Sequence, residues 1–163
     1  DELYPSIVNL VDPMYAKRVR IVGRLDADTT GIILLTDDGR LNNRLTHPNR
    51  SISKIYRVTL NHDIPEKLIE EFAKGVDIGK GEITRPAELK IVAPNVAEVT
   101  LKEGKYHEIK RMFDRFDLDV IELDRLLFGP ISYEGLEVGG SRKLTHEEVE
   151  KLMELTGLDK ERL

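Results

Sequence analysis

The 163-residue chain contains no cysteine, which excludes disulfide bridges, thiolate metal sites and cysteine nucleophiles. It also lacks long hydrophobic runs. The longest unbroken apolar segment is Ile32–Leu35, whereas a membrane helix needs about 20 apolar residues. No secretory signal precedes that segment. We therefore expect a cytoplasmic protein with no membrane partner.

Histidine is scarce as well, and the four histidines have no spacing typical of metal ligands, so we predict no metal site. Ser51 and Ser53 lie near basic residues, but the sequence places no histidine partner beside them. A hydrolytic triad is therefore unsupported.

Apolar residues make up 40% of the chain and charged residues 34%, which is typical of a globular protein. The length suits one domain with a substantial core. The net charge is −5, but residues 15–57 contain nine Lys and Arg against four Asp, which makes that segment +5. A basic segment of this kind is compatible with binding nucleic acid phosphates, although a solvated charged surface explains it equally well.

The segment Gly23–Gly31 is a charged loop between two apolar runs. Asp, Thr and Gly favour turns, so a structural turn is the ordinary interpretation. Arg24 and Asp26 are two residues apart, however, and in an extended segment both side chains project to the same side. A carboxylate held close to a guanidinium stays ionised and can act as a nucleophile. Asp26 with Asp28 is also compatible with a glycosidase pair, but nothing in this charged loop suggests the apolar pocket that such an acid needs.

The hydrophobic pattern predicts an α+β fold in which strands outnumber helices. Helices are expected in four segments, namely through Leu41 and Leu45, from Pro65 to Gly75, over residues 107–116, and from Thr145 to Gly157. The second helix should place Leu68, Ile69, Phe72 and Ala73 on one side. The last helix should bury Val149, Leu152 and Met153. Strands are expected near residues 7–11 and over residues 32–36, 54–60, 87–92, 96–102, 120–123 and 125–128.

Three stretches carry a resemblance to a known family. The loop Gly23–Gly31, continued by the apolar run to Thr36, resembles the catalytic-aspartate motif of RNA pseudouridine synthases. Residues 54–58 resemble the strand whose tyrosine lies against the target uracil, and residues 103–113 resemble the segment that supplies a basic partner to the aspartate. The similarity is closest to the branch that modifies ribosomal RNA and usually carries an S4 RNA-binding domain.

The resemblance implies a mixed, mostly antiparallel sheet with flanking helices and a central active-site cleft. It implies catalytic roles for Asp26, Tyr56 and Lys110 and RNA-binding roles for Arg24, Arg57, His107 and Arg111. Lys110 and Arg24 would hold Asp26 ionised. Many relatives have Gln where this chain has Glu108, so the role of that position is open. Asp26 would attack the sugar C1′ or the base, or remove a proton. No cofactor is needed because the product is an isomer.

The His in the segment Tyr106–Arg111 and the Asp-Thr-Thr-Gly run favour the small-subunit (16S) branch, with large-subunit enzymes as the alternative. A non-catalytic RNA-binding module on the same fold is a second alternative. We expect residues 1–163 to be a monomeric catalytic domain. The S4 domain would precede Asp1, which is not a natural start residue, so we expect a fragment or a processed chain.

Overall fold

The computed structural model of the protein describes residues 18–47 and 52–161. The opening strand expected near residues 7–11 lies outside these ranges. Within them the strands are β1 (Arg20–Val22), β2 (Thr30–Gly31), β3 (Leu34–Thr36), β4 (Lys54–Leu60), β5 (Asp77–Gly79), β6 (Glu82–Ile83), β7 (Glu88–Ala93), β8 (Val96–Leu101), β9 (Val120–Phe128) and β10 (Ile131–Ser132). The helices are α2 (Gly39–Thr46), α3 (Lys67–Lys74), α4 (Glu108–Asp114) and α5 (His146–Thr156), followed by the 3₁₀ helix η3 (Leu158–Glu161).

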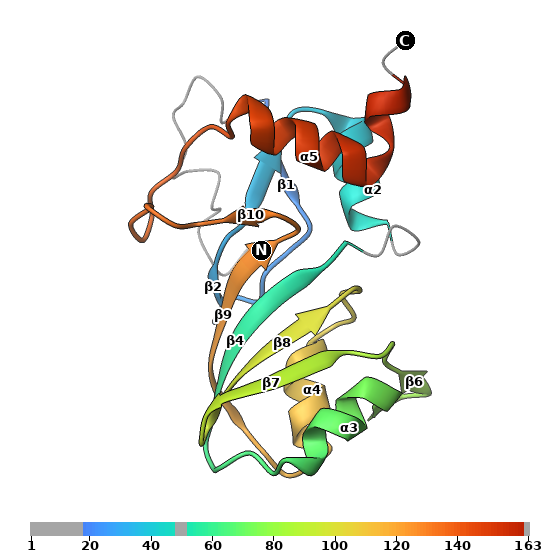
Figure 1. Cartoon of the computed structure of the whole chain (residues 1–163), viewed down its shortest axis with the longest axis vertical. Helices are drawn as coiled ribbons and strands as arrows, with labels where there is room; N and C mark the ends of the chain where they lie inside the picture. The colour runs from blue at the N-terminus through green and yellow to red at the C-terminus, as the bar shows by residue number, and fades with distance from the viewer. Residues whose placement is uncertain (1–17, 48–51, 162–163) are drawn as a thin grey trace.

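A six-stranded sheet forms the centre of the molecule, in the order β10-β9-β4-β8-β7, with β2 pairing to β9. All of its pairs are antiparallel except β2 with β9. Two small pairs, β1-β3 and β5-β6, complete the strands of the described residues. Figure 1 shows α2 and α5 together at one end of the long strands and α3 and α4 at the other. The predicted α+β fold, with a mostly antiparallel sheet and flanking helices, is confirmed.

Two hydrophobic cores lie at the two ends of this sheet. The first packs α3 and α4 against the sheet and includes Phe72, Val99 and Phe113. The second lies beneath α2 and α5 and includes Val22 and Leu152. Strands β4 and β9 form the most extensive strand pairing and run between the two cores. Packing at both ends therefore stabilises the part of the sheet that lies between the two cores.

Most expected elements are present, and several helix ends carry capping interactions. The side chain of Asp38 accepts hydrogen bonds from the first turn of α2. Thr145 and Glu148 form a capping box at the start of α5. Gly75 ends α3 with φ of 92°, a conformation that favours glycine. The hairpin of β7 and β8 turns at residues 94–95.

Four expectations were wrong in detail. Strand β9 is continuous, whereas two strands were expected. β3 begins only at Leu34, because the backbone N–H of Ile32 bonds the carbonyl of Arg125 instead of continuing the β1-β3 ladder. In α3, Ile69 and Ala73 are exposed and only Leu68 and Phe72 are buried. Helix α3 packs on β7, the outermost strand of the sheet, so only a narrow apolar stripe of the helix is buried in the contact. In α5, Leu152 is buried, but Val149 and Met153 are half-buried.

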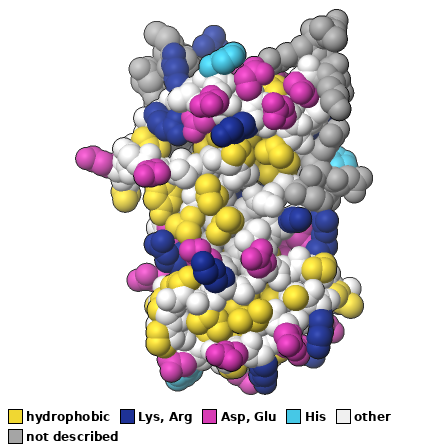
Figure 2. Space-filling view, viewed as in Figure 1, with side chains coloured by type: hydrophobic (Ala, Val, Ile, Leu, Met, Phe, Trp, Pro, Cys, Tyr) yellow, Lys and Arg dark blue, Asp and Glu magenta, His cyan; other side chains and the backbone are white. Residues whose placement is uncertain are grey.

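Within residues 18–47 and 52–161, no helix is long and apolar enough to cross a membrane. Figure 2 shows acidic and basic side chains interspersed over the face it presents. A surface groove of about 600 Å³ lies between the start of α3 and strand β7 and contains none of the predicted site residues.

Candidate active site

The loop that carries Asp26 leaves β1 and is fixed on the long strand β9. The N–H of Thr29 bonds the carbonyl of Asp26 at 2.9 Å, which closes a turn. The hydroxyl of Thr30 then donates to the carboxylate of Asp124 at 2.7 Å, and Thr30 and Gly31 pair in parallel with Asp124 and Arg125. The turn predicted by the ordinary interpretation is therefore present in this loop.

Gly31 is required by this anchoring. Its φ is 115°, and a Cβ at this position would lie 2.3 Å from the carbonyl oxygen of Arg125. The backbones of β2 and β9 approach too closely for any side chain here. The glycine that ends the motif therefore determines how closely the Asp26 loop lies against the sheet.

Two side chains from the α4 segment face Asp26. Lys110 Nζ lies 3.5 Å from Asp26 Oδ2, and His107 Nε2 lies 3.4 Å from Asp26 Oδ1. The side chain of Asp26 is 30% exposed, so a ligand from solvent can reach it. Asp26 belongs to the half of the molecule with β1 and β3, whereas Lys110 and His107 belong to the opposite half. The structure thus brings together residues more than 80 positions apart.

Lys110 also binds the second carboxylate of the loop. Its Nζ lies 2.7 Å from Asp28 Oδ1, and this hydrogen bond lowers the pKa of Asp28 below its usual value. Partial burial acts to lower the pKa of Lys110, but the bond to Asp28 and the charge of Asp26 outweigh it and raise that pKa. Lys110 is therefore a firmly protonated cation between two carboxylates.

Tyr56 lies near the middle of β4, half-buried and packed against the first core. Burial raises the pKa of its hydroxyl, and the negative charge of Asp26 adds to the rise, while the Arg125 guanidinium acts against it. Tyr56 therefore lies within electrostatic reach of Asp26 and carries a neutral phenol. The structure brings Asp26, His107 and Lys110 together, and the charge of Asp26 acts on Tyr56.

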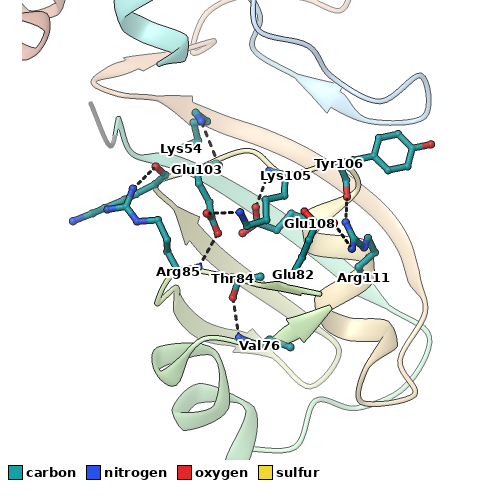
Figure 3. Close-up of polar contacts among 11 residues, drawn as sticks. Lys54, Val76, Glu82, Thr84, Arg85, Glu103, Lys105, Tyr106, Glu108 and Arg111 are labelled. Carbon is teal, nitrogen blue, oxygen red and sulfur yellow. Dashed lines mark hydrogen bonds and ion pairs between the residues drawn. The ribbon is translucent and has the colours of Figure 1, made fainter. Parts of the chain in front are cut away.

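The other predicted residues lie differently. Arg24 is exposed, and no ion pair among the described residues joins it to Asp26. Arg57 follows Tyr56 on β4, so it projects from the opposite face of the sheet. Arg111 is bonded to the carbonyls of Ile78 and Tyr106 and to Glu82, so its guanidinium is already occupied within the protein (Figure 3). The expected pairing of Arg24 with Asp26 is therefore absent from the described residues.

Arg125 was missed in the sequence. It is 2% exposed, its Nε donates to the carbonyl of Ile32 at 2.9 Å, and its guanidinium lies 5.0 Å from the centre of the Phe128 ring. No protein partner of its Nη2 is present among the described residues. The available signal was an arginine that directly precedes the apolar run from Leu126 to Phe128. A charged residue there is buried only if the chain supplies partners for it.

A second buried ionisable group lies at the start of α4. Glu108 is 4% exposed and accepts a hydrogen bond from the N–H of Lys105 at 2.8 Å. Burial and the neighbouring Glu103 carboxyl raise the pKa of Glu108 to about 8. The side chain is therefore a neutral acid near pH 7, with nearly the shape of glutamine. Figure 3 shows Glu108 beside Glu103 and Lys105.

Comparison with known proteins gives matches over most of the chain. Residues 5–115 match the family model described as RNA pseudouridylate synthase. The chain is 38% identical over 151 residues to ribosomal small subunit pseudouridine synthase A of Escherichia coli (strain K12), which covers 91% of this chain and 65% of the relative. The protein of the same name from Vibrio cholerae is 40% identical with the same shares covered. The chain thus spans about 65% of the length of these curated relatives.

Solved structures also match this chain. A crystal structure of a pseudouridylate synthase superposes with a TM-score of 0.88 at 40% identity, over 91% of this chain and 66% of that chain. The archaeal box H/ACA sRNP Nop10–Cbf5 complex gives a TM-score of 0.51 at 18% identity, over 78% of this chain and 42% of that chain, and so shares the fold alone. The resemblance inferred from the three motifs is confirmed.

Proposed function

The chain belongs to the RNA pseudouridylate synthase family, and we propose that it isomerises a uridine of ribosomal RNA to pseudouridine. We further propose that small-subunit (16S) RNA contains its target. The relatives named as small-subunit enzymes support the substrate. The observation that carries the chemistry is the position of Asp26, with Lys110 and His107 within 3.5 Å of its two oxygens.

The reaction breaks the bond between N1 of uracil and C1′ of ribose and forms a bond between C5 and C1′. The C5 proton is lost and N1 gains a proton, so the product is an isomer and no cofactor is needed. We propose that Asp26 is the nucleophile, because its carboxylate lies 3.5 Å from the ammonium of Lys110 and is open to solvent. The target base must first leave the RNA stack, at a cost of a few kcal/mol.

Lys110 is proposed to hold Asp26 charged and oriented. As an ammonium ion it acts as a point charge, without the two-pronged geometry of arginine. Tyr56 is proposed to pack on the uracil and to assist loss of the C5 proton. Because its phenol is neutral, it must give up its own hydroxyl proton as it accepts the proton from C5. His107 is proposed to contact RNA at the edge of the site. Arg24 and Arg57, which are exposed, are proposed to bind phosphates outside it.

Arg111 is better described as a positioning residue, because all of its described bonds are within the protein.

We propose that the chain acts as a monomer, because Asp26, Tyr56 and Lys110 come from one chain. We also propose that residues 1–163 form the catalytic domain and that it works in the cytoplasm, where ribosomal RNA is modified.

The test is release of tritium from ribosomal RNA labelled at C5 of uridine. Incubation with unmodified 16S transcript is expected to release tritium and to produce one new pseudouridine by carbodiimide mapping, whereas a 23S transcript gives none. Release from 23S RNA alone would overturn the substrate but not the chemistry. Binding of 16S RNA without release from either transcript would identify a non-catalytic module.

A further inference from the structure

Tyr106 is an exposed aromatic residue at the edge of the candidate site. It is 72% exposed, although large aromatic side chains are usually mostly buried. One face of its ring stacks on the imidazole of His107, with ring centres 3.9 Å apart and planes inclined by 19°. Because His107 covers one face only, the other face is open to solvent.

His107 joins this stack to the reacting carboxylate. Its Nε2 lies 3.4 Å from Asp26 Oδ1, and its backbone has φ of 49° and ψ of 36°, a left-handed conformation that few non-glycine residues adopt. Such conformations persist where the surrounding structure fixes them, often at ligand sites. His107 therefore contacts both the Tyr106 ring and the Asp26 carboxylate.

The backbone below Tyr106 is held rigidly. Arg111 Nη1 donates to the carbonyl of Tyr106 at 2.8 Å, and the same guanidinium is fixed by Glu82 at 2.8 Å. Glu108 accepts a bond from the N–H of Lys105 just before it. Figure 3 shows the carbonyl of Tyr106 facing Arg111 while its ring points away from the polar cluster. The ring is thus presented outward by a segment that is already ordered.

We propose that the open face of Tyr106, backed by His107, stacks on a nucleobase of the RNA substrate that flanks the target uridine. This inference rests on the proposed function and extends it. The proposed mechanism places the reacting uracil against Asp26 and Tyr56, and the open face of Tyr106 lies on the side of its ring away from His107, which contacts Asp26. That position suits a neighbouring base in the same strand. Aromatic side chains stack on any base, so the platform adds affinity without selecting a sequence.

A tryptophan reporter tests the contact directly, because the chain contains no tryptophan. Tyr106→Trp places a single indole on the platform, and Leu155→Trp places one on α5, at a site 49% exposed in the other half of the molecule. Adding unmodified 16S transcript is expected to quench the fluorescence of Tyr106→Trp and to leave that of Leu155→Trp nearly unchanged. Equal responses of the two variants would overturn the inference.

Truncation tests the energy of the contact. Tyr106→Ala is expected to weaken binding of the 16S transcript by about 10- to 100-fold, the usual effect of losing one stacked base. Tyr106→Phe, which keeps the ring, and Leu155→Ala are expected to stay within about 2-fold of the parent protein, since neither removes a stacked ring. KM is expected to rise more than kcat falls in Tyr106→Ala. An affinity of Tyr106→Ala equal to that of Tyr106→Phe would contradict the platform.

These measurements are separate from the test of the proposed function. Selective quenching of Tyr106→Trp without tritium release by the parent protein would support the platform and overturn the isomerase. Tritium release by the parent protein, with Tyr106→Ala binding RNA as tightly as the parent, would support the isomerase and overturn the platform.

Discussion

The ammonium of Lys110 lies 2.7 Å from Asp28, closer than the 3.5 Å that separates it from Asp26. The side chain of Asp28 is 73% exposed and that of Asp26 30% exposed. The outer carboxylate therefore shares the cation with the carboxylate proposed as nucleophile. Asp28 competes for Lys110 without being placed to react itself.

Asp28→Asn is therefore expected to leave the enzyme active. Removing the outer carboxylate frees Lys110 to move toward Asp26, so kcat should stay within about 5-fold of the parent value. Exposed ion pairs contribute roughly 0–1 kcal/mol to stability, so the melting temperature should change little. Tritium release and thermal unfolding check both points. A loss of activity as large as that of Asp26→Asn would show that Asp28 takes part in the chemistry.

Lys110→Met removes the cation while keeping most of the side-chain volume. We expect kcat to fall by about 100-fold or more, because preorganised charges at reacting groups typically contribute that much. Lys110→Arg restores a cation and should recover part of this activity. Lys74→Met, at an exposed cation on α3, is the matched control. Single-turnover tritium release measures the effect, and full activity of Lys110→Met would rule out its proposed role.

Gly31→Ala tests the anchoring of the Asp26 loop. The new Cβ would lie 2.3 Å from a backbone oxygen of β9 at a φ of 115°, so strand β2 must move away. We expect a loss of about 2–4 kcal/mol of unfolding free energy together with loss of activity. Gly135→Ala is the control, since its φ of 84° is also positive but no atom lies within 4 Å of the added Cβ. Similar urea midpoints for the two variants would contradict the close β2-β9 contact.

The raised pKa of Glu108 predicts that the stability of the folded protein depends on pH. In the folded protein its pKa is about 8, above the value of 4.5 for an unperturbed glutamate. The folded state therefore binds more protons than the unfolded chain between these values, and stability falls as pH rises through 8. Glu108→Gln, which cannot ionise, should raise the melting temperature at pH 9 by about 5 °C and change it little at pH 5.

The control for this effect is Glu71→Gln, at a half-exposed position on α3. Its melting temperature should follow that of the parent protein over the whole pH range. If Glu108→Gln and the parent show parallel melting curves from pH 5 to pH 9, Glu108 is ionised in the folded protein and its burial has another explanation.

Local pattern predicted much of this fold. The strand from Lys54 to Leu60 and the capping box at Thr145 depend on alternation and on contacts three residues apart, both visible in sequence. Pairing of β4 with β9 and of β2 with β9 joins distant segments, so its register could not be predicted. The continuous strand β9 was divided because Asp124 interrupts its apolar pattern.

For the site, the motifs predicted Asp26 and Lys110 together, and their proximity agrees. Arg125 and Glu108 could not be identified as buried, because burial of a charged side chain depends on partners supplied by the tertiary structure. The internal partners of Arg111 could not be predicted for the same reason. Its partners lie on the β5-β6 hairpin, which no apolar pattern indicated.

The central claim is that Asp26 performs the chemistry, and Asp26→Asn tests it most directly. The variant keeps the shape of the side chain and loses its charge, so the melting temperature and RNA affinity should stay close to those of the parent. Tritium release from the C5-labelled 16S transcript should fall below detection, because no other carboxylate in the loop can replace the nucleophile. A folded Asp26→Asn protein that releases tritium at the parent rate would contradict the account.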